Sequence, residues 1–417
     1  MDAQALRWCL LPDFDLQFSR AAANASWRTR VRSTVLKGVP WRFTPTRHSE
    51  VGGALVVTRT VNEERVVDPL LPRRTPVAIP GLAERPDRAA RRSPAAREML
   101  AWVEAFLEDH GRRELLPMWR DAVLGTEHHL QRYLAADLAR YRVVVVPRQS
   151  HPFVRALILA AEAHGVPVVF VPHSPLTHWQ VDLPVSYAGM RGVAERATIV
   201  EVTGADPERI DVIGNPDTDI LAARPPRIRS GLPGVLALSP DPEPQLRRII
   251  ELVHAAGVGP VVVAPHSRSD VERLERIVPR EWVIARVERT LDLLHEGPPW
   301  LVQCSSGVAW ESAVLGIPTG DVRLGDRVPD YPFLEDPRFA ALSTSADVAA
   351  FIARVASTDR DLLREAALAW CAIDGRAAVE QGRALIARAD RSLAGQRIAD
   401  AWAPGGVLER QSPLLSA

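Results

Sequence analysis

The feature that most constrains this chain is a regular alternation of short, mostly apolar segments with stretches of helical periodicity. The apolar segments cover residues 142–147, 168–171, 210–213, 235–238, 261–264, 282–287 and 300–303. Strands that are apolar on both faces are typical of parallel sheets, because helices cover both faces of such sheets. Alternation over this length predicts an α/β protein with doubly wound parallel sheets.

The alternation is interrupted by a stretch rich in Pro, Gly and Arg, residues 223–234, which we interpret as an interdomain linker. We therefore expect a first domain over residues 1–222 and a second domain over residues 235–394. Residues 395–417 are expected to form a C-terminal tail.

Residues 1–95 are the least regular part of the first domain. Apolar and polar residues alternate over Ala54–Val67, around an Asn-Glu-Glu turn, and this pattern predicts a β-hairpin. Beyond them, helical periodicity predicts helices over Ala95–Asp109, Trp119–Arg140, 152–164, 346–356 and 359–389, the last of them broken near Asp374.

Composition excludes several classes of protein. Basic and acidic residues balance at 51 each, so charge offers no case for a nucleic-acid partner. Cys9, Cys304 and Cys371 are far apart and follow no metal-binding spacing, which argues against a disulfide framework and a zinc site. No signal peptide is evident, and no apolar run approaches the about 20 residues that cross a bilayer. We expect a cytoplasmic protein; a homodimer and peripheral membrane association stay open.

One segment, residues 300–322, combines a buried strand, a small polar turn, a helix and a second strand. The helix directs unpaired N–H groups and the positive end of its dipole at the space above Ser305, Ser306 and Gly307, which suits a phosphate. Glu311 lies one helical turn beyond Gly307, with its carboxylate directed back toward the same place, where it can accept hydrogen bonds from ribose hydroxyls. The segment predicts a nucleotide site. The alternative is that Ser306 only caps the helix and Glu311 is a solvated carboxylate.

Histidines follow three of the expected strands. His151 and His173 come after two neighbouring strands of the first domain, and His266 comes after a strand of the second. Ligands of parallel α/β sheets bind beyond the carboxyl ends of the strands, so these side chains are expected to line a cleft. An imidazole titrates near neutral pH, which makes each a candidate for proton transfer, with structural hydrogen bonding as the alternative role.

Three segments occur in an order and spacing that resemble GT-B-type glycosyltransferases. Residues 165–174 (GVPVVFVPHS) and 204–219 (GADPERIDVIGNPDTD) resemble the second half of an N-terminal domain in this group. The specific kin are capsular-polysaccharide, polysialyl- and glycerophosphotransferase-like enzymes and UDP-N-acetylglucosamine 2-epimerases. Residues 305–318 (SSGVAWESAVLGIP) resemble the nucleotide-binding turn and helix of the C-terminal domain. The resemblance covers residues 140–355.

The resemblance implies two Rossmann-like domains that face a cleft, with an irregular N-terminal region that contains the hairpin. It implies transfer of a sugar from a nucleotide-sugar donor to a hydroxyl of a glycan, a lipid-linked acceptor or a small molecule, without a metal cofactor, as in polysaccharide biosynthesis. Charge on the leaving diphosphate then needs N–H donors and cations, and the acceptor hydroxyl needs a base. The implied residues are Ser305, Ser306, Gly307, His266 and Arg268 for the first role, His173 or His151 for the second, Glu311 for the ribose, and Arg286 near the nucleotide base.

The sequence also departs from the family pattern. Ser174 stands where a glycine usually follows the histidine, and residues 264–270 (APHSRSD) match the epimerase motif only loosely, at His266. Further polar residues at strand or turn ends rank lower as site candidates: Asp182, Asp217, Glu288 and Asp321. Two other functions stay open: an epimerase or hydrolase acting on the nucleotide sugar alone, and a non-catalytic nucleotide-sugar-binding protein.

Overall fold

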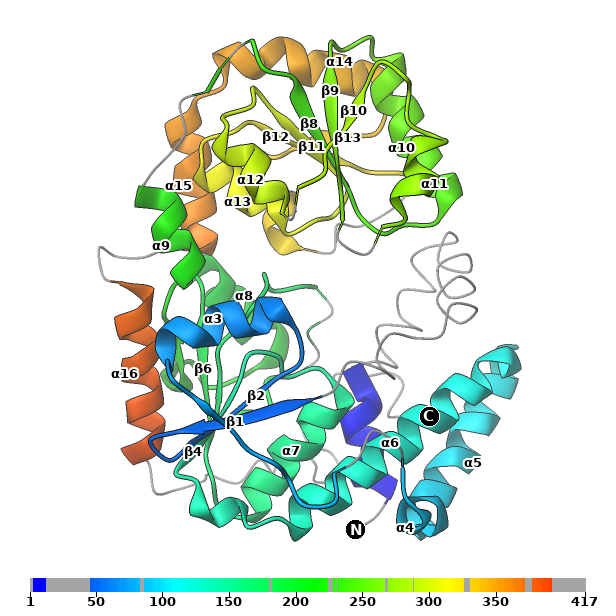
Figure 1. Ribbon diagram of the computed structural model, residues 1–417, viewed down its shortest axis with the longest axis vertical. Helices are drawn as coiled ribbons and strands as arrows, with labels where there is room; N and C mark the ends of the chain where they lie inside the picture. The colour runs from blue at the N-terminus through cyan, green and yellow to red at the C-terminus, as the bar shows by residue number, and fades with distance from the viewer. Residues whose placement is uncertain are drawn as a thin grey trace.

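The computed structural model contains two α/β domains, one above the other in Figure 1. The residues that it describes are 3–12, 46–82, 86–178, 180, 182–223, 228–229, 231–266, 269–287, 289–325, 331–371 and 377–391. Within this part of the chain, no helix has the length and apolar composition needed to cross a bilayer. The expected class, two doubly wound Rossmann-like domains, is confirmed by the two sheets below.

The first sheet has the strand order β3-β1-β2-β4-β5-β6-β7. Its strands are β1 (Arg47–Val51), β2 (Ala54–Thr58), β3 (Thr75–Pro76), β4 (Val143–Val146), β5 (Val168–Phe170), β6 (Tyr187–Met190) and β7 (Ile210–Val212). β2, β4, β5, β6 and β7 are parallel to one another, whereas β1 pairs antiparallel with β2 and β3. The valines of β4 are buried on both faces, as expected of a central parallel strand.

Helices cover both faces of this sheet. The described helices that precede the second sheet in the chain are a helix over residues 3–12, α3 (Val61–Leu70), α4 (Arg88–Arg92), α5 (Pro94–Asp109), α6 (Leu116–Ala135), α7 (Pro152–Ala163), α8 (Val193–Thr203) and α9 (Pro216–Ala223). Short 3-10 turns lie at Arg113–Leu115, Leu138–Arg140 and Pro207–Arg209. α5 and α6 pack on each other and, with α7, bury Trp119, Met99 and Tyr133 in the largest apolar core of the domain.

The hairpin lies earlier in the chain than the sequence predicted. β1 and β2 are joined at Gly52 and Gly53, which both have positive φ angles, and the predicted second strand is instead helix α3. Thr60 caps this helix by accepting a hydrogen bond from the Glu63 backbone at 3.3 Å. Thr followed three residues later by Glu is a sequence signature of a helix start, and this local signal outweighed the alternation.

The second sheet is entirely parallel, with the order β10-β9-β8-β11-β12-β13. Its strands are β8 (Gly234–Leu238), β9 (Val261–Pro265), β10 (Val283–Ile284), β11 (Leu301–Gln303), β12 (Thr319–Val322) and β13 (Ala340–Leu342). Its helices are α10 (Glu243–Ala255), α11 (Val271–Glu275), α12 (Thr290–His295), α13 (Val308–Val314), α14 (Ser345–Arg354) and α15 (Arg360–Trp370), with 3-10 turns at Pro332–Glu335 and Val355–Ser357.

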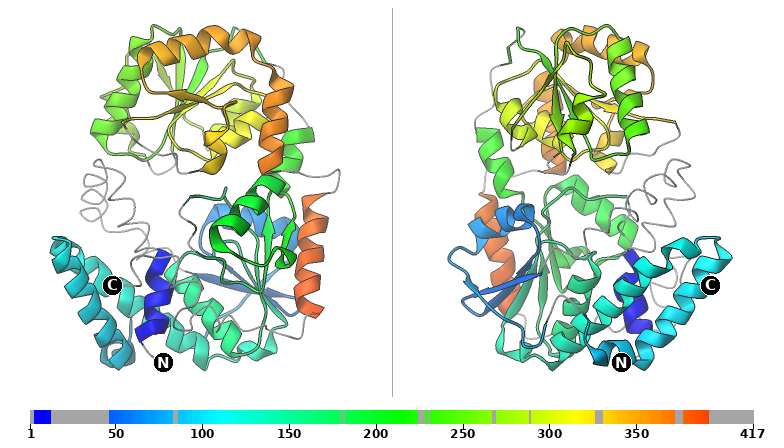
Figure 2. Two further views of the ribbon diagram at one scale, coloured as in Figure 1. Left: turned by 180° about the vertical axis from the view of Figure 1, so that it is seen from behind. Right: turned by 45° about the vertical axis from the view of Figure 1, so that its right-hand side comes forward.

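The last described helix, α16 (Ala378–Arg391), packs on the first sheet and not on the second. Leu385, Ile386 and Ala389 share an apolar core with residues of β2, β4 and β5. Arg388 adds an ion pair with Asp211 of β7 at 2.9 Å. In both views of Figure 2 this helix lies along the first domain. The predicted second domain of residues 235–394 therefore ends too late, because α16 belongs to the first domain by its packing.

Candidate functional site

The second sheet has a switch point between β8 and β11. Numbered in chain order, its strands follow the order 3-2-1-4-5-6, the Rossmann order, so the helices after β8 and β11 leave the sheet in opposite directions. In such sheets ligands bind in the crevice at the carboxyl ends of the strands on either side of the switch point. The turn after β11, which the sequence singled out, stands at this place.

A buried hydrogen-bond network holds that turn. Asp321 Oδ1 accepts from the Ser305 backbone N–H and from Gln303 Nε2, both at 2.9 Å. Gln303 Oε1 in turn accepts from the Ser306 backbone N–H at 2.5 Å. Ser305 has a φ of 49°, a left-handed conformation that is unusual for a residue other than glycine. Two of the three amides predicted to hold phosphate therefore already have acceptors within the protein.

A cavity of about 430 Å³ lies between the two domains above this turn. It is lined by Val61, Asn62, Arg65 and His173 of the first domain and by Pro265, His266, Arg289, Thr290, Leu291, Ser306, Val308 and Glu311 of the second. We call it the interdomain cavity. The structure thus brings together His173, His266, Ser306 and Glu311, four residues that the sequence proposed as site residues.

Charged groups of both signs face the interdomain cavity. Arg289 follows β10 and its guanidinium lies 3.8 Å from the Glu311 carboxylate, both side chains being partly exposed. Arg65 of α3 contributes a second guanidinium from the opposite domain. Sequence analysis missed Arg65 and Arg289, because neither lies in a recognisable motif and only packing of the two domains places them on one cavity.

His173 is held as a neutral imidazole by its surroundings. Its Nδ1 lies 2.7 Å from the Pro147 carbonyl, to which it donates, so Nε2 is the acceptor for Arg148 Nη2 at 3.0 Å. Burial and the neighbouring Arg148 guanidinium lower the pKa of His173 to about 4. Its only lone pair is directed at a cation, which is the wrong arrangement for a general base.

Arg148 is the centre of a charge chain that sequence analysis did not find. Besides His173, it donates from Nε to Glu63 Oε1 at 2.8 Å. Glu63 is almost fully buried and its second oxygen accepts from the Arg59 backbone N–H at 2.6 Å. Although burial alone acts in the opposite direction, the Arg148 guanidinium and these hydrogen bonds together lower the pKa of Glu63. The chain fixes the turn after β4 against the start of α3.

His151 has a different position from that predicted. It precedes α7 and its Nδ1 accepts from the Phe153 backbone N–H at 3.2 Å, so it acts as the N-cap of that helix. Its ring packs edge-on against Phe153. Burial and nearby arginines, Arg59 among them, hold its pKa well below the usual value of 6.5. His151 is not among the residues that line the interdomain cavity.

The lower-ranked candidates have structural partners. Asp182 forms a two-point ion pair with the buried Arg155, at 2.7 Å for each contact, and Asp321 supports the turn described above. Arg286 is largely exposed and lies 3.4 Å from Glu275. The Arg268 and Glu288 predictions lie outside the described residues, as does the Asp217 side chain.

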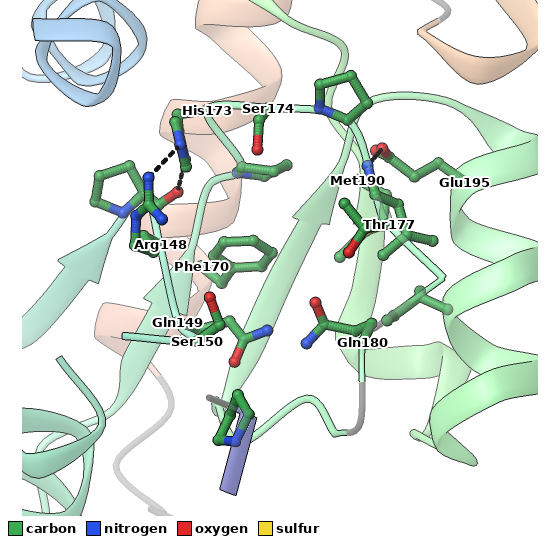
Figure 3. A pocket seen from close by; sticks show the side chains of 16 residues that line it. Arg148, Gln149, Ser150, Phe170, His173, Ser174, Thr177, Gln180, Met190 and Glu195 are labelled. Atoms are coloured by element: carbon green, nitrogen blue, oxygen red, sulfur yellow. Dashed lines mark hydrogen bonds between the residues drawn. The ribbon is translucent and has the colours of Figure 1, made fainter. Parts of the chain in front are cut away.

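A second cavity, of about 230 Å³, lies beside the first one in the N-terminal domain, at the carboxyl ends of β4, β5 and β6 (Figure 3). His173 lines both cavities. Among the described residues, no cluster of three or more His, Cys, Asp or Glu side chains could hold a metal ion. We call this second space the inner cavity.

Comparisons with known proteins found similar solved structures of low sequence identity. No family model matches the sequence, and no curated protein matches it. One similar structure is the Methanocaldococcus jannaschii UDP-GlcNAc 2-epimerase in complex with UDP-GlcNAc and UDP. The alignment covers 64% of this chain and 80% of the epimerase chain, with 15% sequence identity and a TM-score of 0.46. A second similar structure is the wall teichoic acid polymerase TagF. The alignment covers 64% of this chain and 87% of the TagF chain, with 11% sequence identity and a TM-score of 0.40.

A further similar structure is the glycosyltransferase SnogD from Streptomyces nogalater, at 16% identity over 65% of this chain and 79% of its own, with a TM-score of 0.39. The class of fold follows from the topology of the chain itself: two Rossmann-like domains face a shared cavity, and a C-terminal helix returns to the first domain. This is the GT-B arrangement. Structures similar to this chain include UDP-GlcNAc 2-epimerases, a glycosyltransferase and a teichoic acid polymerase.

Proposed function

We propose that the protein binds a nucleotide sugar in the interdomain cavity and transfers its sugar to an acceptor hydroxyl. The observation that carries this proposal is the composition of that cavity at the switch point of the second sheet. Arg65, Arg289 and His266 surround it with groups that attract a diphosphate, and Glu311 offers an acceptor for ribose hydroxyls. A volume of about 430 Å³ is within the range of small-molecule sites.

We propose that arginines stabilise the negative charge that develops on the leaving diphosphate. The Ser305 and Ser306 amides are engaged by Asp321 and Gln303, so the guanidiniums from the two domains are the better partners of the leaving diphosphate. Because Arg65 and Arg289 lie on different domains, a bound diphosphate would link them. We assign no general base, since His173 accepts from Arg148 and its pKa is lowered to about 4.

Nucleotide binding is tested by thermal shift with UDP, GDP, TDP, CDP, CMP and ADP. A ligand present at about 100 times its Kd stabilises the native state by about 2.7 kcal/mol. We expect one nucleotide to raise the melting temperature of the wild type and to have a much smaller effect on Arg289→Ala and Glu311→Ala. Arg286→Ala is the matched control, because Arg286 is exposed and does not line the cavity. No shift with any nucleotide would refute the proposal.

Incubating the protein with the matching nucleotide sugar distinguishes sugar transfer from the two alternatives, an epimerase or hydrolase and a non-catalytic binding protein. The presence of a second cavity that shares His173 favours a second substrate, and hence a transferase. Release of the nucleotide should then depend on added acceptor. Conversion of the nucleotide sugar by the protein alone would favour an epimerase or hydrolase, and binding without any turnover would favour a non-catalytic binding protein.

A further inference from the structure

The inner cavity has a lining that is polar but carries no available charge. Its polar groups are amides and hydroxyls of Gln149, Ser150, Ser174, Thr177 and Gln180, and its apolar walls include Phe170, Leu176, Met190, Ile199 and several prolines. Figure 3 shows the side chains of Gln149 and Gln180 pointing toward each other across the space. Such a lining suits a molecule with hydroxyl groups on its edge and an apolar face.

The two charged residues of the lining are both neutralised within the protein. Arg148 donates to Glu63 and to His173. Glu195 accepts from Arg191 Nη2 at 3.0 Å and from the Leu176 backbone N–H at 2.7 Å, and it is buried. Each would lose a buried partner if it turned to a charged ligand, and that loss is costly. A charged ligand group is therefore disfavoured here.

An unpaired buried oxygen of Gln149 indicates that the inner cavity binds a ligand. Its side chain is 2% exposed, and its Oε1 is buried without a hydrogen-bond partner among the described residues. Buried carbonyl oxygens are nearly always paired, because an unpaired one costs free energy. An oxygen of this kind on the wall of a cavity is satisfied when a donor, such as a hydroxyl, occupies the cavity.

The volume limits the size of the occupant. A dry cavity of about 150 Å³ accommodates benzene, so about 230 Å³ accommodates one substituted six-membered ring. The position of the cavity adds a second limit, since His173 lies on its border with the interdomain cavity. A ring bound in the inner cavity would thus have one edge directed at the space proposed for the nucleotide sugar.

We propose that the inner cavity binds a single uncharged sugar ring, free or at the end of a glycan, with one of its hydroxyls donating to Gln149 Oε1. This ring is the acceptor if the proposed function holds, and the inference that the acceptor is a neutral sugar rests on that function. Binding of the ring itself does not, because it depends only on the first domain.

Binding is tested by saturation-transfer NMR with the full-length protein and no nucleotide. The neutral probes are methyl glycosides of glucose, galactose, mannose and N-acetylglucosamine at millimolar concentration, and the anionic probes are methyl glucuronide and glycerol 3-phosphate. We expect saturation of at least one neutral probe and of neither anion. Gln149→Leu should weaken that binding by about fivefold or more, the effect of one lost hydrogen bond. It should leave the melting temperature unchanged or raised, because it removes an unpaired buried oxygen.

A control variant and a second test variant accompany Gln149→Leu. Gln245→Leu makes the same change on α10 of the other domain and should leave glycoside binding at the wild-type level. Thr177→Val, which removes a hydroxyl from the cavity wall, should weaken binding and serves as the second test if Gln149→Leu does not fold. The proposal is overturned if no neutral glycoside binds, if an anionic probe binds in a manner that depends on Gln149, or if Gln149→Leu and Thr177→Val both bind like the wild type.

The outcome is independent of the nucleotide experiment. Nucleotide binding with no glycoside binding would overturn this inference and leave the proposed function standing. Glycoside binding without any nucleotide shift would support the inner cavity and refute the proposed function.

Discussion

Asp321→Ala is the variant that most directly tests our account of the turn after β11. Asp321 Oδ1 is the acceptor for two donors, the Ser305 N–H and Gln303 Nε2. Asp321 and Gln303 are no more than 1% exposed and Ser305 is 9% exposed, so water does not readily replace the lost acceptor. An unpaired buried donor costs about 1–3 kcal/mol. We therefore expect the free energy of unfolding of the second domain to fall by about 3 kcal/mol.

The assay is scanning calorimetry, with the transition of the second domain followed separately if the two domains melt apart. For a domain of this size, about 1 kcal/mol corresponds to about 2–4 °C, so the melting temperature should fall by about 6–12 °C. Asp321→Asn keeps an Oδ1 acceptor and should lose about 1 kcal/mol. Asp361→Ala removes a carboxylate from the surface and should change stability by less than about 0.5 kcal/mol.

The reasoning is refuted if Asp321→Ala melts at the same temperature as Asp361→Ala. That result would mean that the Asp321 carboxylate is not needed to pair the turn, and that it is available for a ligand, as the sequence alone allowed. A large loss of stability in Asp321→Ala together with intact folding of Asp321→Asn would identify Asp321 as the support of the cavity wall.

Three further predictions concern Ser305, Arg148 and His48, which is a buried residue of β1. Ser305→Gly should raise stability by up to about 1 kcal/mol in denaturant unfolding, because φ = 49° is strained for serine, and lowered stability would contradict this. Arg148→Met should raise the pKa of His173 above about 4 in a long-range ¹⁵N NMR titration, because it removes a neighbouring cation; an unchanged value would show that burial alone sets it. Burial lowers the pKa of His48 to about 4, from 6.5. As the pH falls, the unfolded state therefore binds a proton before the folded state does. The contribution of His48 to the free energy of unfolding is fully present above pH 6.5 and is lost as the pH falls toward 4, by about 3 kcal/mol. His48→Gln should reduce the pH dependence of the melting temperature in that window, to which His129, His151 and His173 also contribute.

The interdomain cavity is lined both by residues that the sequence proposed as site residues and by residues that no pattern revealed. The sequence named Glu311 and His266 because each follows a strand or turn whose role is set locally. The sequence did not predict Arg65 as a site residue, because Arg65 lies on helix α3, where the sequence pattern predicted a strand. The roles given to Ser305 and Ser306 did not anticipate Asp321 and Gln303 as acceptors of their amides. Competition between a ligand and the protein for the same N–H is settled only by the folded structure.

The sequence by itself determined the parallel part of the first sheet, the parallel second sheet and most of their elements. Apolar runs such as Val143–Val146, followed by helical periodicity, are local signals, and neighbouring residues alone produce them. The tertiary structure alone decided the return of α16 to the first sheet, the guanidinium of Arg148 against His173, and the acceptor on the Ser305 amide. In each case the partners are 16 or more residues apart, and side chains of the same type elsewhere could have met the same need. Which pair forms depends on the packing of whole elements, and a periodic pattern carries no information about that choice.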